Sequence, residues 1–278
     1  MLVAAVIHAT WNLFNKQAAS GGAPFAWMVA AAATLLYAPP AVVLISVTRP
    51  HLGWLDLGFI AGSAVLHTAY FLLLQRGYGH GDLSLVYPLA RGTGPLLASL
   101  VAIPLFAERP GPWGLAGIVL VAGGVFALGL PDRSSIRPTP AAFGYGLATG
   151  VFIASYTLWD KHAVDALAIA PLLLMWGTDL GRCVLVAPLA LRRRDQLPRL
   201  WRTYRWQVVG AGLLSPLAYI LVLTAMSVSP VSAVAPMREL SVLVGVVLGG
   251  RLLAEGNLRR RLPAAVAIAG GIVAIAAG

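Results

Sequence analysis

Three charged residues lie inside long runs of apolar residues, the kind of segment that is buried away from water. Arg91 belongs to the run 82–106, while Arg238 and Glu239 belong to the run 230–254. Arg91 follows the start of its run by nine residues, which is roughly 13 Å of helix at about 1.5 Å per residue. Charges at such depth are costly and mark pathways by default. Because a guanidinium presents a planar fork to carboxylates and phosphates, the chemistry expected here is the binding of an anion.

Two arrangements of these charges are open. In the one that we favour, Glu239 pairs with Arg91 or Arg238, and the other guanidinium binds a carboxylate or phosphate of a substrate. In the other, all three form an internal network that fixes the helices and touches no substrate. Tyr87 lies one turn before Arg91, and nearby prolines, including Pro236 in the second run, leave backbone carbonyls that need other partners.

A polar stripe runs along the first apolar segment. Its residues follow the i, i+3, i+4, i+7 spacing of one helical face: His8, Trp11, Asn12 and Asn15. Since lipid satisfies no hydrogen bond, we expect the stripe to face a substrate cavity, with hydrogen bonding between helices as the alternative. Tyr156, Thr157 and Asp160 form a similar polar face in the sixth run.

Aromatic and titratable residues supply further candidates. Tyr70 and Tyr219, with Tyr156 and two tryptophans (Trp11 and Trp159), are candidates for the aromatic lining of a cavity, with core packing or an interfacial belt as the alternative. The candidate proton carriers are Glu239, Asp160 and His67, because imidazole titrates near neutral pH. For His67 the alternative is hydrogen-bonded packing. Asp160 lies near a helix end, as do Lys16 and Lys161. For these three residues the alternative is that the side chain snorkels to the membrane surface.

The elements that must position these residues are membrane-spanning helices. Of the 278 residues, 59% are hydrophobic and 11% are charged, against about 25% charged in a soluble domain. Ten apolar runs are long enough to cross about 30 Å of hydrocarbon. They are residues 1–19, 24–48, 54–77, 82–106, 112–130, 141–161, 168–191, 206–228, 230–254 and 258–278. We therefore predict an all-α membrane protein, without a soluble catalytic or nucleic-acid-binding domain.

The sequence repeats itself. VAGGVFAL at 121–128 returns as IAGGIVAI at 268–275, and HATWNLFNKQA at 8–18 returns as IASYTLWDKHA at 153–163. We predict two five-helix repeats, 1–130 and 141–278, joined by a loop at 131–140. An odd number of spans per repeat inverts the second copy, and inverted repeats place a binding site near the midplane at their interface. The paired glycines at 123–124 and 270–271 are expected to bring helices close together.

Three segments carry a family resemblance: HATWN in the first run, PLARGTGPLLASLVAIPLFAERP at 88–110, and APMRELSVLVG at 235–245. With the two halves, they make the chain similar to an EamA-type member of the drug/metabolite transporter superfamily. The resemblance implies ten helices in two inverted repeats and a cavity lined by the first, third, fourth, sixth, eighth and ninth helices. It also implies export or uptake of small metabolites, but it identifies no substrate.

The function that we predict is secondary transport of a small metabolite, such as an amino acid or organic anion, by alternating access. Alternatives are a flippase for a lipid-linked head group, a non-transporting membrane protein, and an intramembrane enzyme. Because the sequence contains no HExxH, GxSxG or phosphate-loop motif, we expect no catalytic residues, metal or cofactor. The expected partners are the substrate and the lipid bilayer, with no nucleic acid.

Location and assembly follow from the same reasoning. We expect a multi-pass protein of a bacterial inner membrane, with the first run retained because it lacks the features of a removable signal peptide. Basic residues at 192–205 and 259–261 place those loops in the cytoplasm by the positive-inside rule, whereas the family resemblance places the termini there. Orientation, proton coupling and formation of a homodimer stay open.

Overall fold

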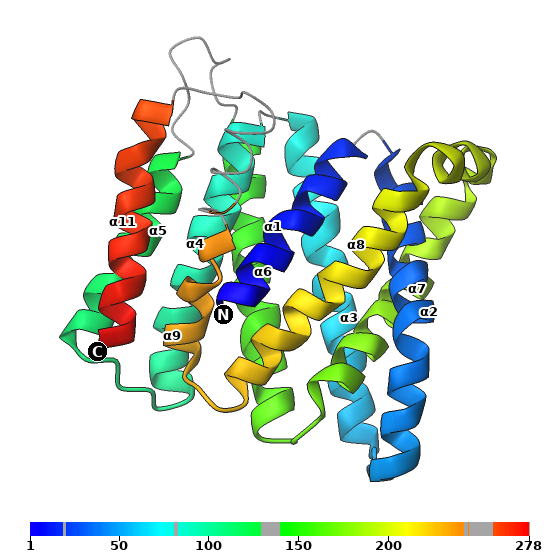
Figure 1. The fold of residues 1–278 in the computed structure, drawn as a ribbon, viewed down its shortest axis with the longest axis horizontal. Helices are drawn as coiled ribbons and strands as arrows, with labels where there is room; N and C mark the ends of the chain where they lie inside the picture. Colours follow the sequence, from blue (N-terminus) through cyan, green and yellow to red (C-terminus); the bar gives the residue numbers. More distant parts are fainter. Residues whose placement is uncertain (19–20, 81–82, 129–139, 242–243, 245–257, 278) are drawn as a thin grey trace. The chain divides into compact units, whose positions relative to one another are not determined.

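The computed structural model describes residues 1–18, 21–80, 83–128, 140–241, 244 and 258–277. Every regular element in that part of the chain is a helix (Figure 1). The elements are α1 (Leu2–Gln17), α2 (Gly22–Thr48), α3 (Trp54–His80), α4 (Leu83–Leu105), α5 (Pro112–Leu128), α6 (Pro140–Asp165), α7 (Pro171–Leu191), η2 (Arg194–Gln196), α8 (Leu197–Met226), α9 (Val231–Met237) and α11 (Leu258–Ala277).

The helices have the length and composition of membrane spans. Five of them are long and apolar enough to cross a bilayer, namely 22–48, 54–77, 140–165, 171–191 and 194–226. Four shorter apolar helices cover 2–15, 89–105, 112–127 and 263–277. Large apolar side chains, such as those of Leu35, Val119 and Val184, are exposed on the outside of these helices, as contact with lipid requires. The predicted all-α membrane fold is confirmed; most of the predicted run 230–254 beyond α9 lies outside the described residues.

The chain divides into two compact units by its contacts. The first unit contains residues 1–5, 69–158 and 228–278, and the second contains residues 6–68 and 159–227. The division falls within α1, α3 and α6, each of which contributes to both units. Each unit therefore combines segments from both halves of the sequence, and the two predicted repeats stay a statement about sequence symmetry.

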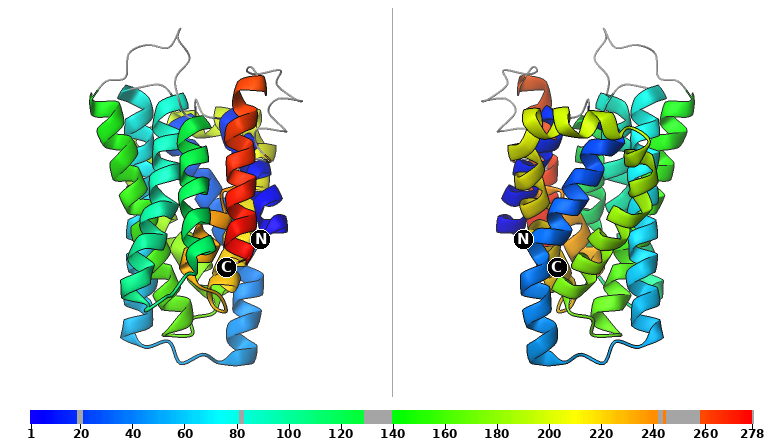
Figure 2. Two further views of the ribbon diagram at one scale, coloured as in Figure 1. Left: turned by 90° about the vertical axis from the view of Figure 1, so that its left-hand side faces the viewer. Right: turned by 90° about the vertical axis from the view of Figure 1, so that its right-hand side faces the viewer.

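In the first unit, α5 and α11 lie side by side along most of their length (Figures 1 and 2). A Cβ atom on Gly124 would lie 2.8 Å from a backbone oxygen of α11, and one on Gly271 would lie 2.7 Å from a backbone oxygen of α5. Gly123 and Gly270 have nothing within 4 Å of such an atom. Only one glycine of each predicted pair therefore permits close packing, because adjacent helical residues point about 100° apart.

The second unit is built around α2, α7 and α8. Hydrogen bonds from aromatic side chains to backbone oxygens join these helices: the indole of Trp176 donates to Thr34 over 3.0 Å, and the hydroxyl of Tyr37 donates to Leu213 over 2.7 Å. Within α7, Asp179 and Arg182 form the ion pair expected from their spacing, at 3.0 Å. These bonds satisfy polar groups that lipid would leave without partners.

A kink at Tyr204, whose φ is −122° and ψ is 19°, separates the arginine-rich start of α8 from its apolar remainder. The side chains of Trp201 and Trp206 are exposed beside it, and the guanidinium of Arg205 lies 5.5 Å from the ring centre of Trp206. Tryptophan and arginine together are typical of the membrane surface. The bend therefore marks the end of the spanning part of α8.

Candidate functional site

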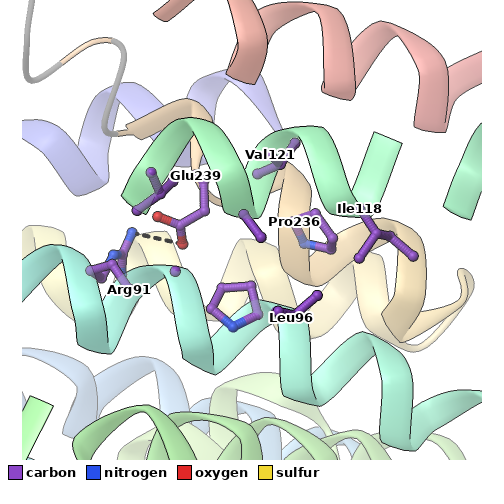
Figure 3. A pocket seen from close by; sticks show the side chains of 10 residues that line it. Arg91, Leu96, Ile118, Val121, Pro236 and Glu239 are labelled. Atoms are coloured by element: carbon purple, nitrogen blue, oxygen red, sulfur yellow. Dashed lines mark ion pairs between the residues drawn. The ribbon is translucent and has the colours of Figure 1, made fainter. Parts of the chain in front are cut away.

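The first unit contains a buried ion pair between Arg91 of α4 and Glu239, which follows α9. The guanidinium Nη2 lies 3.2 Å from the carboxylate Oε1 (Figure 3) and donates a hydrogen bond to the hydroxyl of Ser241 over 3.0 Å. Arg91 is 6% exposed and Glu239 is 1% exposed. Of the two pairings that the sequence leaves open for Glu239, the structure has the one with Arg91. Ser241 was missed by sequence analysis, because a serine in an apolar run carries no distinctive signal.

A narrow space lies beside this ion pair (Figure 3). It measures about 170 Å³ between the lining atoms and leaves no room for a water molecule. Its walls are apolar apart from the ion pair and consist of Gly92, Pro95, Leu96, Ile118, Val121, Ala122, Val125 and Pro236. Within the described part of the chain, neither carboxylate oxygen of Glu239 accepts a hydrogen bond. The glutamate therefore has acceptor capacity that the ion pair does not use.

Arg238, the residue that follows α9, contacts α6. Its guanidinium donates to the hydroxyl of Thr157 and to that of Tyr156, each over 3.3 Å, and lies 5.9 Å from the centre of the Tyr156 ring. The ring of Tyr70 meets that of Tyr156 edge-on, with centres 5.8 Å apart. The first unit thus places the predicted residues Arg238, Tyr156 and Tyr70 in one cluster of hydroxyls and rings.

The second unit contains a buried acid, Asp160 of α6, between two ring side chains. Its Oδ2 accepts a hydrogen bond from the hydroxyl of Tyr219 over 2.7 Å and lies 3.1 Å from Nε2 of His67. Asp160 is 0% exposed. The snorkelling alternative is therefore wrong for this residue, because the carboxylate is held inside the unit by α3 and α8.

Lys161, the next residue of α6, binds groups at helix ends. Its ammonium is buried, donates to the backbone oxygen of Met226 over 2.7 Å, and lies 3.1 Å from the carboxylate of Asp165. The lysine therefore provides a hydrogen-bond donor to a backbone oxygen at the end of α8. The side chain of its sequence counterpart, Lys16, lies outside the described residues.

Comparisons with known proteins match the sequence in part and the fold over nearly the whole chain. Residues 1–130 match the EamA-like transporter family. These residues are similar to EamA-like transporters. The match confirms the family resemblance over the first predicted repeat, and this family implies a membrane transporter of the drug/metabolite transporter superfamily. No curated protein matches the chain.

The fold of the chain is similar to that of a solved protein described as "Crystal structure of protein". The TM-score is 0.78, and the sequences are 16% identical, over 98% of this chain and 94% of that chain. At such low identity the likeness shows the fold alone. The apolar helices and the family match support an integral, multi-pass membrane protein.

Residues of the polar stripe form hydrogen bonds within their own helix, α1. The indole of Trp11 lies 3.2 Å from Nδ1 of His8, and the amide of Asn12 donates to the backbone oxygen of His8 over 2.9 Å. These three residues and Asn15 are half-buried. The predicted lining role of the stripe stays a prediction.

Two further candidate residues, Trp159 and Tyr87, are not part of the clusters described above. Trp159 donates from its indole to the backbone oxygen of Phe59 over 2.8 Å and stacks on the Phe59 ring, so it packs as part of the second unit. The side chain of Tyr87 lies outside the described residues. Among the residues that the structure describes, no group of three or more histidines, cysteines or acids is arranged to hold a metal ion.

Proposed function

We propose that this EamA-type transporter is a secondary carrier for a small metabolite bearing a carboxylate or phosphate, such as an amino acid or organic anion. One observation carries the proposal: two buried arginines and one buried glutamate occupy the first unit. Together, Arg91, Arg238 and Glu239 carry two positive charges and one negative charge. Because burial removes competing water, such a group attracts an anion far more strongly than it would at a surface.

Arg238 is the residue to which we assign contact with the substrate. Its hydrogen bonds to Thr157 and Tyr156 measure 3.3 Å, which is at the long end for a guanidinium donor. A carboxylate or phosphate oxygen forms charge-assisted bonds of about 2.7–2.9 Å with the same fork and is roughly twice as strong an acceptor. An anionic substrate therefore displaces the hydroxyls at a net gain.

The neighbouring side chains receive different roles. Tyr156 and Tyr70, whose rings meet edge-on, supply an apolar wall for the body of the substrate. Arg91 is held by Glu239 and Ser241, so we assign it to fixing the position of α4 and to raising the local potential. The acceptor capacity of Glu239 suits an amino or hydroxyl group of the substrate.

The narrow space beside Arg91 fits a closed state of such a carrier. Since it leaves no room for water, a substrate enters only after α4 and the segment around α9 move apart. Prolines in both segments, Pro95 and Pro236, lower the cost of such bending because each removes a backbone hydrogen bond. We therefore propose alternating access by movement of these two segments.

The proposal is tested by exchange transport in proteoliposomes with a panel of amino acids, organic anions and amines. The wild-type protein is expected to exchange at least one anionic compound. Arg238→Gln should slow that exchange about tenfold or more, because a charge-assisted hydrogen bond contributes about 1.5–3 kcal/mol. Arg238→Lys keeps the charge but loses the fork, so an intermediate rate is expected.

The matched control is Arg205→Gln, because this guanidinium lies over Trp206 at the start of α8. It should leave the rate unchanged. Exchange of amines alone, or an Arg238→Gln rate equal to that of the control, would refute anion binding. Transbilayer movement of a lipid-linked head group without exchange of any soluble anion would support the flippase instead.

A further inference from the structure

We propose that Asp160, His67 and Tyr219 form a proton-binding site in the second unit, and that transport is coupled to its protonation. The coupling rests on the proposed transport function, whereas the binding of the proton does not. The site joins α6, α3 and α8 through one carboxylate oxygen, Oδ2, which contacts both other side chains. The rings of His67 and Tyr219 also meet edge-on, with centres 5.4 Å apart.

The burial of the acid is the first reason for this assignment. Asp160 has no exposed surface, and its second oxygen, Oδ1, has no hydrogen-bond partner among the residues that the structure describes. A buried carboxylate oxygen without a donor is costly when the group is charged. An unpaired oxygen costs less when the acid is protonated and neutral, so the geometry at Oδ1 is compatible with the protonated acid.

The cluster changes its net charge by one when it takes up a proton. With a neutral imidazole and a carboxylate, the cluster carries one negative charge. One proton, added to the imidazole of His67 or to the carboxyl of Asp160, makes the cluster neutral. A neutral cluster is favoured where water is excluded. The proton comes from water on one side of the membrane and returns to water on the other, so the cycle needs no further reactant.

Other titratable groups of this unit have contacts of their own. Lys161, next to Asp160 on α6, bonds to the end of α8 and to Asp165, while His162 stacks on Phe59 of α3. On α7, Asp179 is paired with Arg182. On α2, the hydroxyl of Tyr37 donates to the backbone of α8. Tyr156, one turn before Asp160 on α6, belongs to the first unit. None of the contacts described here for these groups involves Oδ2 of Asp160, which contacts Tyr219 and His67.

The internal repeat makes the site asymmetric. By the alignment of 8–18 with 153–163, Asp160 corresponds to Asn15, and Tyr219 corresponds to Tyr70. An amide does not titrate, so only the second copy holds an acid at this position. The position equivalent to His67 in the second copy is Pro216, which again leaves one titrating cluster. One proton is therefore expected for each transport cycle.

Proton binding is measured without any substrate, by infrared difference spectroscopy of the full chain in lipid nanodiscs between about pH 5 and 8. The wild-type spectra are expected to contain carboxyl and imidazole bands that change with one common midpoint. Asp160→Asn should remove those changes. The matched control Asp179→Asn, which replaces a buried acid with an arginine partner, should retain them.

Tyr219→Phe keeps the acid and removes one donor to the carboxylate, so it tests the site even if Asp160→Asn does not fold. Loss of that donor disfavours the charged form. The midpoint should then move to higher pH by about one unit, a tenfold gain in proton affinity. Bands that do not change in the wild-type protein, that persist in Asp160→Asn, or whose midpoint is the same in Tyr219→Phe would overturn the assignment.

Coupling is then tested in proteoliposomes with an anion that the wild-type protein exchanges. A pH gradient should accelerate wild-type net uptake, and Asp160→Asn should lose this acceleration while it retains exchange. Wild-type uptake that ignores the gradient would overturn coupling. Absence of all wild-type flux would overturn the proposed transport function instead, and the infrared titration would still decide whether the site binds a proton.

Discussion

The ion pair between Arg91 and Glu239 leads to a quantitative expectation about stability. Arg91→Met and Glu239→Gln each remove one charge and leave the other inside the first unit. The remaining residue has 6% or 1% of its surface exposed, so water cannot replace the lost partner. Breaking a buried pair in this way costs about 3–5 kcal/mol of the free energy of unfolding.

The geometry gives a similar magnitude independently. The charged atoms are 3.2 Å apart, and at an effective dielectric constant of about 20 two unit charges at that distance attract by roughly 5 kcal/mol. The double variant Arg91→Met, Glu239→Gln removes both charges and leaves no buried ion. It should lose only about 1–2 kcal/mol, mainly through the hydrogen bond to Ser241 and altered packing.

The assay is a denaturant titration of the four proteins in mixed micelles, followed by tryptophan fluorescence. Asp179→Asn provides the comparison, because its partner Arg182 lies at a similar distance, 3.0 Å, but has 22% of its side chain exposed. Partial hydration of Arg182 should make this loss smaller than that of Glu239→Gln.

Two results would refute this reasoning. One is a loss below about 1 kcal/mol for either single variant, which would place the pair in contact with water. The other is a double variant whose loss equals the sum of the single losses, which would show that the two charges do not interact. Because loss of Arg91 is expected to weaken the fold, transport by Arg91 variants is a poor test of substrate binding, and Arg238 is the better position.

Further predictions concern packing and helix ends. Glu108→Ala removes the carboxylate that accepts from the first two amides of α9, at 2.6 and 2.9 Å, and should cost about 1–2 kcal/mol of unfolding free energy; an unchanged midpoint would contradict this. Gly124→Ala should destabilise by about 1–3 kcal/mol, because its Cβ would lie 2.8 Å from a backbone oxygen of α11, whereas Gly123→Ala should be neutral or stabilising. Equal losses for the two glycine variants would be inconsistent with the helix contact. Lys161→Met should lower the midpoint of thermal unfolding, since it leaves the end of α8 without its donor; an unaltered midpoint in a thermal melt would argue for an exposed lysine.

Much of the fold is predictable from the sequence because partition between lipid and water depends on composition. Nearly every described helix coincides with a predicted apolar run within a few residues. The ion pair of Asp179 with Arg182 is equally predictable, since three residues along one helix bring two side chains together whatever packs around it.

The site is only partly predictable. Sequence position shows that Arg91, Arg238 and Glu239 are buried too deep to be ordinary surface charges, but not which arginine meets the glutamate. That choice depends on the direction in which each helix faces its neighbours. The same holds for the glycine pairs, where rotation of α5 and α11 about their axes decides that Gly124 and Gly271 make the contact.

The sequence by itself determined that the chain is a helical membrane protein with charges inside its spans, because hydrophobicity and helical spacing are local properties. Only the tertiary structure decided what those charges do. Asp160 meets His67 and Tyr219, which are 93 and 59 residues away along the chain, and no local pattern encodes such a meeting. The physical reason is that a buried carboxylate takes its partners from whichever helices pack against it, and packing depends on the whole fold.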